Sequence, residues 1–183
     1  MQHANLKHIM LSTLFCAFAG SQSLAIAAGE HGSQAPGQKP VADYRALTAD
    51  EQTVQALLDG YAEAMEDKSV KAMEQVVIPG DFSTIESGYP NWSWEDFRDN
   101  HLLIEMDTFT DVEYTIELIS AELKDPLGFA IYQYTAAGKM QGKTDTVSIS
   151  GLGTAILEKT AAGWRVHHLH TSAPRAQLEG MSN

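Results

Sequence analysis

Cysteine is almost absent from this chain of 183 residues, because Cys16 is the only one. Cys16 lies in an N-terminal segment that we expect to be removed, so the mature chain is predicted to have neither disulfides nor thiol chemistry. A fold without disulfides depends on its hydrophobic core. From Ala42 onward about 140 residues remain, which is enough for one domain with a substantial core.

Basic residues are also scarce. The chain has 12 Lys and Arg against 24 Asp and Glu, for a formal net charge of -12, and the basic residues are scattered along the sequence. Such a chain repels nucleic acids and anionic lipids, so we predict that neither is a partner. The acidic excess favours solubility and identifies no partner by itself.

Long hydrophobic runs are missing as well. The longest, residues 9–19, is too short for a stable membrane anchor. A weakly basic start (Lys7 and His8) precedes it and the small-residue segment at 25–27 follows, which is the layout of a secretory signal. We therefore predict a signal peptide over residues 1–27, export to the periplasm or the medium, and no membrane anchor after cleavage.

The rest of the chain is expected to contain one domain between two irregular ends. Residues 28–45 are rich in Gly, Pro, Ser and Gln, and this composition predicts a flexible linker. The domain is expected at residues 46–174, and residues 175–183 are expected to be a disordered tail.

Helices dominate the first half of the predicted domain. Thr48 and Glu51 fit a capping box, and apolar residues then follow at helical spacing up to Met65. Ser69 is expected to cap a second, shorter helix that ends before Pro79. A short strand over residues 82–88 and a loop at residues 90–91 should precede a third helix, from about residue 93 to residue 108.

Strands dominate the second half. Alternating apolar and polar residues predict a strand at 112–118, and further strands are expected at 129–136, 144–159 and 164–172. Gly151 and Gly153 interrupt the third of these strands, where we expect a bulge or a sharp bend. Helices followed by an antiparallel meander predict an α+β fold, with the helices packed on one face of a strongly bent sheet.

The last predicted strand carries three of the five histidines that would remain after removal of residues 1–27. In a regular strand, alternate side chains share a face. The run WRVHHLHTS would therefore place one set of side chains together: Trp164, Val166, His168, His170 and Ser172. A face that passes from tryptophan to two histidines and a serine is typical of a pocket lining.

The third helix has polar residues on a stripe that should be buried. Its stripe at helical spacing consists of Trp94, Phe97, Arg98, His101, Ile104, Glu105 and Thr108. Two explanations remain open. In one, His101 pairs with Glu105 one turn on and Arg98 extends to solvent. In the other, all three project into a cavity enclosed by the sheet.

These segments resemble a known family. The segment WEDFRDNHL (residues 94–102) with Glu105, the strand GLGTAILEK (residues 151–159) and the closing WRVHHLHTS are similar to the SnoaL-like branch of the nuclear transport factor 2-like superfamily. The final strand is also similar to the close of the association domain of calcium/calmodulin-dependent protein kinase II. The resemblance covers residues 46–172.

The resemblance implies a cone-shaped fold with a pocket between sheet and helices, commonly dimeric through the outer face of the sheet. It implies little about activity, because members include isomerases, dehydratases and oligomerisation domains. A homodimer is also expected from the residues, since a second copy would cover side chains such as Tyr132, Tyr134 and Ile119.

Three functions remain open at this point. The first is a binding domain whose pocket holds a small polar or anionic molecule between His101, His168, His170 and Arg98. The second is an enzyme with His168 or His170 as general base, and with Tyr61 or Arg98 orienting the substrate. The third is a metal site, and its ligands would be His101, Glu105, His168 and His170. No organic cofactor is expected.

Overall fold

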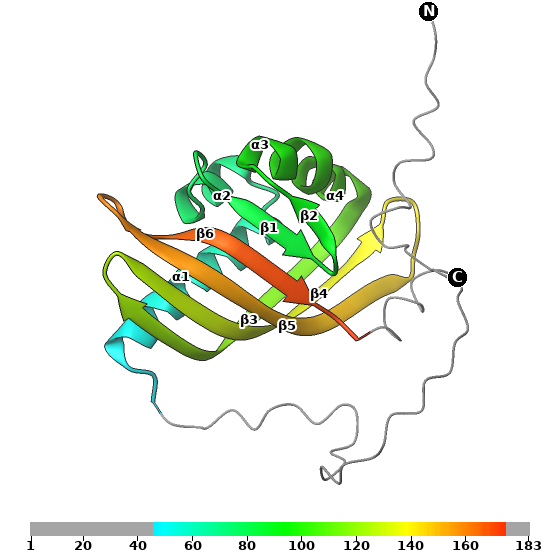
Figure 1. Cartoon of the computed structure of the whole chain (residues 1–183). Coiled ribbons are helices and arrows are strands. Elements are labelled where there is room, and N and C mark those ends of the chain that lie inside the picture. Colours follow the sequence, from blue (N-terminus) through cyan, green and yellow to red (C-terminus); the bar gives the residue numbers. More distant parts are fainter. Residues whose placement is uncertain (1–45, 175–183) are drawn as a thin grey trace, which may run out of the picture. The chain divides into compact units, whose positions relative to one another are not determined.

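The computed structural model describes residues 46–174 (Figure 1). The predicted signal, linker and tail lie outside the described residues. The domain begins at Leu47, and its chain order is helices first and then the long strands. No helix among the described residues has the length and apolar character needed to cross a membrane.

Two helices open the domain. Helix α1 spans Ala49–Glu66 and helix α2 spans Val70–Val76. The predicted capping box is confirmed: the backbone N–H of Glu51 donates to Thr48 Oγ1 at 3.3 Å, and the backbone N–H of Thr48 donates to Glu51 Oε2 at 2.9 Å. These bonds satisfy two backbone donors that the helix itself cannot. Ser69 caps α2 as expected, accepting from the N–H of Ala72 at 3.1 Å.

Six strands form one sheet in the order β2-β1-β6-β5-β4-β3. Their bounds are β1 Ser83–Glu86, β2 Tyr89–Asn91, β3 Phe109–Lys124, β4 Leu127–Met140, β5 Thr146–Thr160 and β6 Gly163–Ser172. Strands β3 to β6 form the predicted antiparallel meander, and β1 joins β6 in parallel. Figure 1 shows the strong bend of the long strands, so the α+β prediction is confirmed.

The segment between β1 and β3 differs from the prediction in two places. The expected loop at residues 90–91 is part of the short strand β2, which pairs with β1 around a turn with positive φ at Ser87 and Gly88. The expected single helix is divided into α3 (Trp94–Phe97), a π-helical turn (Arg98–Leu102) and α4 (Leu103–Thr108). A π-helical turn holds one more residue than an α-turn, so it changes which side chains face the core.

Side chains of helix α1 form hydrogen bonds with the backbone of strand β3. The amide of Gln55 donates to the carbonyl of Ile116 and accepts from the N–H of Leu118, both at 2.9 Å. The carboxylate of Glu66 accepts from the N–H of Tyr114 at 2.7 Å. Because β3 is at the edge of the sheet, these side chains satisfy backbone groups that a further strand would otherwise bind.

The side of the sheet covered by α1 and α2 is called the inner face here, and the opposite side the outer face. The register places Leu157, Ala155, Tyr132 and Tyr134 on the inner face, where all four are buried. Five large apolar side chains share the outer face and are exposed: Leu127, Phe129, Ile131, Leu152 and Ile156. The expectation that Tyr132 and Tyr134 lie on the outer face is therefore wrong.

The two glycines of β5 make room for tyrosine rings. A Cβ atom on Gly153 would lie 2.3 Å from Cζ of Tyr132. One on Gly151 would lie 2.1 Å from the backbone oxygen of Ser172 and 2.8 Å from Cε1 of Tyr134. Both glycines lie in a stretch of β5 that pairs with β4 without a register shift. The predicted bulge at these glycines is therefore wrong, and their role is to let the tyrosines lie close to the strand.

Candidate functional site

A β-bulge in strand β6 divides the predicted histidine face. Val166 pairs with Leu157 and His168 pairs with Ile156, so His167 is an extra residue without a partner on β5. One extra residue reverses the alternation of all that follow it. Val166 is buried on the inner face, whereas beyond the bulge Leu169 and Thr171 take the inner positions.

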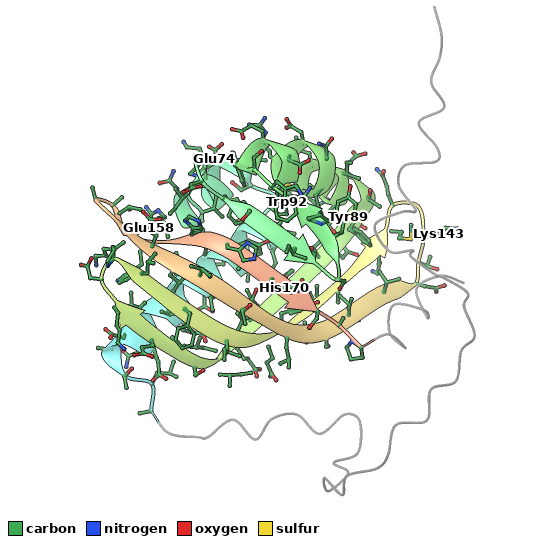
Figure 2. The ribbon with its side chains drawn as sticks, in the orientation of Figure 1. Glu74, Tyr89, Trp92, Lys143, Glu158 and His170 are labelled. Carbon is green, nitrogen blue, oxygen red and sulfur yellow. The ribbon has the colours of Figure 1, made fainter. Side chains whose placement is uncertain are left out.

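His168, His170 and Ser172 consequently lie on the outer face, and the prediction that they share a face with Val166 is wrong. His170 is exposed on β6, on the side of the sheet opposite α1 (Figure 2). His168 is half-buried, and its Nδ1 lies 2.9 Å from Oγ of Ser83 on the neighbouring strand β1. None of the three is close to the inner-face cluster described below.

Two other predicted pocket residues also lie elsewhere. The guanidinium of Arg98 forms a two-point ion pair with the neighbouring Asp99, with Nε 2.7 Å from Oδ1 and one terminal nitrogen 2.8 Å from Oδ2. Arg98 lies in the π-helical turn, and its charge is satisfied at the surface. Trp164 is on the inner side but half-buried at the end of the core, with Nζ of Lys159 5.2 Å from the centre of its ring.

His101 is the centre of the polar cluster that the structure does form. Its side chain is only 6% exposed, and its two ring nitrogens have three partners. Nδ1 lies 3.1 Å from Oδ1 of Asn91, while Nε2 lies 3.3 Å from Oε2 of Glu86 and 3.2 Å from Oε1 of Glu105. The predicted pairing of His101 with Glu105 is present, and Glu86 is added from strand β1.

The two carboxylates determine the protonation of this imidazole. Burial by itself would lower the pKa of His101, but the charge of Glu86 and hydrogen bonds to Glu105 and Glu86 outweigh it and raise the pKa to about 11. The interaction with His101 in turn lowers the pKa of Glu86, against the effect of its own burial. The cluster therefore holds one imidazolium and two carboxylates, an excess of one negative charge.

Tyrosine side chains from α1, β3 and β4 surround Glu86 on the inner face. They are Tyr61, Tyr114, Tyr132 and Tyr134. Burial, followed by the charge of Glu86 or of a neighbouring tyrosine, raises the pKa of every one of these phenols. Tyr114 contacts Tyr61 edge-to-face and stacks on Tyr134, with ring centres 6.1 Å apart in both pairs. Protonated hydroxyl groups therefore lie within electrostatic range of the Glu86 carboxylate.

Of the predicted residues, the structure brings His101 and Glu105 together and buries Tyr61 in the core, whereas sequence reasoning missed Glu86. Glu86 follows Phe82, just before β1, and Thr84 in β1 at a spacing of two, and both of these residues are buried. That alternation was a usable signal for an inward-facing carboxylate. Thr84 Oγ1 is the only side-chain polar atom in residues 46–174 that is fully buried without a hydrogen-bond partner. Its position on β1 is paired with that of Asn91 on β2.

Comparison with solved structures supports the fold. A nuclear transport factor 2-like superfamily protein from Salmonella enterica has a TM-score of 0.60 at 17% identity, over 67% of this chain and 89% of that one. A protein from Xanthomonas campestris, described as a calcium/calmodulin-dependent protein kinase II association domain, has a TM-score of 0.59 at 20% identity, over 74% and 97%.

A third neighbour is described as a scytalone dehydratase from Novosphingobium aromaticivorans, with a TM-score of 0.61 at 7% identity, over 68% of this chain and 84% of that one. At these identities the three neighbours show a shared fold and no shared activity. No curated protein matches the chain. The sequence pattern of the SnoaL-like domain matches residues 54–176, and the chain therefore belongs to the SnoaL-like family within the nuclear transport factor 2-like fold.

Proposed function

We propose that this domain binds a small organic molecule on its inner face, at the cluster of Glu86, His101 and Glu105, and that the molecule is uncharged or positively charged. The observation that carries the proposal is the charge of the cluster, since two carboxylates face one imidazole. A carboxylate accepts hydrogen bonds from hydroxyl or ammonium groups and repels anions.

Exposure and neighbours support access to this cluster. The side chain of Glu86 is 28% exposed and that of Glu105 is 40% exposed, so a ligand can reach both without unfolding the core. The neighbouring tyrosines are buried and their hydroxyl groups remain protonated, so they add no further charge beside the carboxylates. The exposed carboxylates therefore suit a ligand that carries a hydroxyl or amino group.

Two of the roles expected from the sequence, anion binding and general-base catalysis by a strand histidine, depend on residues that lie outside this cluster. The cationic groups meant to bind an anion, namely Arg98, His168 and His170, lie outside the cluster. A general base at His168 or His170 would act on the outer face. His101 is poorly suited to that role, because both of its ring nitrogens face acceptors and its pKa is raised to about 11.

Three matched naphthalene probes test the proposal on metal-free protein: 2-naphthol, 2-naphthylmethylamine and 2-naphthoate. We expect the neutral and cationic probes to bind at least about tenfold more tightly than the anion, a difference of about 1.4 kcal/mol. Glu86→Gln should reduce this difference in affinity between the probes. Glu122→Gln is the control: it also removes one negative charge, from an exposed ion pair with Lys124, and it should leave the difference unchanged. Equal binding of all three probes, or a preference for 2-naphthoate, contradicts the proposal.

Export remains part of the proposed function. It is supported by the signal layout of residues 1–27, which lie outside the described residues. N-terminal sequencing of protein from its own cell should give a start near Ala28. Recovery of Met1 as the N-terminus of the accumulated protein would contradict export by this signal.

A further inference from the structure

We propose that Glu86, His101 and Glu105 bind a divalent transition-metal ion of the Zn²⁺ class, with one nitrogen and two carboxylate oxygens as ligands. The inference rests on the inner-face site proposed above and specifies an inorganic occupant for it. The three residues come from strand β1, the π-helical turn and helix α4, so the fold assembles the set from separate segments.

The distances between the donor atoms fit such an ion. Nε2 of His101 is 3.3 Å from Oε2 of Glu86 and 3.2 Å from Oε1 of Glu105. One donor atom from each of the three residues lies within 4.8 Å of the other two. Zinc–nitrogen and zinc–oxygen bonds of about 2.0–2.2 Å in a tetrahedron place neighbouring ligands roughly 3.3–3.6 Å apart. Only small movements would therefore be needed to coordinate the ion.

The orientation of His101 is the second, independent observation. Nδ1 lies 3.1 Å from Oδ1 of Asn91, a residue only 1% exposed, and this bond turns Nε2 toward the two carboxylates. Histidines that bind metals usually donate their other ring N–H to a carbonyl or carboxylate in this way. The ring also contacts Phe97 and Tyr89, with centres 5.3 Å and 6.3 Å away. The imidazole is therefore held in place before any ion binds.

The donor set indicates the class of metal. One imidazole and two carboxylates suit Zn²⁺, Co²⁺, Mn²⁺ or Fe²⁺, whereas Ca²⁺ prefers six to eight oxygen ligands and Cu⁺ prefers sulfur. A dication would also balance the charge of Glu86 and Glu105. Three protein ligands leave at least one coordination position for water or a ligand atom, as in catalytic rather than structural zinc sites.

A second group of residues gives an internal control. Asp81, Glu158 and His167 also bring donor atoms within 4.8 Å of one another. Nδ1 of His167 is 3.1 Å from Glu158 and 3.8 Å from Asp81, but the side chain of Asp81 is 75% exposed. His167 of that group is the extra residue at the bulge of β6, and it is no part of the inner-face cluster. A variant at His167 therefore tests whether metal binds at the surface instead.

The experiment is a titration of the EDTA-treated, dialysed protein with Co²⁺, read from its visible absorption, and with Zn²⁺ by calorimetry. We expect one equivalent per chain. Glu105→Ala and His101→Gln should each weaken binding at least tenfold, while His167→Gln should leave it unchanged. Glu105 is the safer position because it is partly exposed, and far-ultraviolet circular dichroism should confirm that each variant is folded.

Three outcomes would overturn the metal site: no binding to the folded parent at about 100 μM metal, binding that survives Glu105→Ala, or binding lost in His167→Gln. The naphthalene titration is done without metal, so the two proposals fail separately. If the probes bind according to their charge but Co²⁺ does not bind, the organic site is supported and the metal site is rejected. If Co²⁺ binds but the probes bind equally, the metal site is supported and the organic site is rejected.

Discussion

The two faces of the sheet have opposite chemistry although they are made of alternate residues of the same strands. On β5, Leu157 is 0% exposed on the inner face and the adjacent Ile156 is 44% exposed on the outer face. The inner face combines a packed core with a charged cluster whose groups are paired. The outer face carries large apolar side chains that are exposed. We propose that this difference reflects two binding roles, with a small ligand at the inner face and a protein surface at the outer face.

The histidines show the same contrast. His101 on the inner side lies between two carboxylates, whereas His168 on the outer side lies near two other histidines. Both are partly or wholly withdrawn from water. Burial alone therefore does not decide whether a histidine keeps its proton. The charges of the neighbouring side chains decide it.

The largest effect should come from a matched pair of truncations on β5. Leu157→Ala removes a buried side chain from the core and should cost about 2–5 kcal/mol of unfolding free energy. Ile156→Ala removes a side chain from the outer face and should cost less than about 1 kcal/mol in the isolated monomer. Urea unfolding of both variants measures the difference. Equal losses would mean that the outer face is covered within the chain.

The second prediction concerns the outer face. We propose that the outer face binds a second copy of the chain. Phe129 pairs with Ile156 across β4 and β5, at the centre of the five exposed apolar residues. Contiguous apolar surface of this kind is typical of an interface. Phe129→Asp should weaken the dimer at least about hundredfold, or about 2.7 kcal/mol, in sedimentation.

Thr135→Asp is the control for this change, since Thr135 is exposed on the same strand and face but pairs with Ser150, away from the apolar centre. It should leave the dimer largely intact. A parent protein that sediments as a monomer at micromolar concentration would contradict the proposed dimer.

A glycine on the inner face gives the third prediction. Gly153→Ala places a Cβ within 2.3–2.5 Å of three atoms of Tyr132, so the ring or the strand must move. Overpacking of this kind costs about 1–3 kcal/mol. The neighbouring outer-face change Thr154→Ala should stay within about 0.5 kcal/mol. Thermal unfolding compares them, and a neutral Gly153→Ala would show that Tyr132 has room to shift.

Local sequence signals predicted most of the fold. The capping box of Thr48 and Glu51, the cap at Ser69 and the alternation in the long strands depend on residues close together in the chain. Such signals are strong because the interactions that they report are themselves local. The α+β class and the family followed from them.

The site was harder to predict because its geometry is non-local. The bulge at His167 exists only in the pairing of β6 with β5, and no residue of β6 alone announces it. Glu86 on β1 contacts His101 of the π-helical turn, fifteen residues later in the chain. The π-helical turn then directs Arg98 outward and His101 inward. Each of these features depends on partners that periodicity cannot identify.

The most direct comparison of the faces is the titration of two histidines in metal-free protein, followed by nitrogen-15 NMR of the imidazoles. Burial, His170 and His167 lower the pKa of His168, so it should lose its proton below pH 6.5. His101 should remain protonated above pH 9, because Glu86 and Glu105 raise its pKa to about 11.

The sign of the associated stability follows from the same values. A folded pKa above the unfolded value of about 6.5 means that the protonated His101 stabilises the fold fully below pH 6.5, and that this contribution declines as the pH rises toward 11. Glu86→Gln removes the charge that raises the pKa of His101 most, so it should lower the pKa of His101 and leave that of His168 unchanged. If both histidines titrate together near pH 6.5, the carboxylates do not raise the pKa of His101. The proposed difference between the histidines of the two faces would then be wrong.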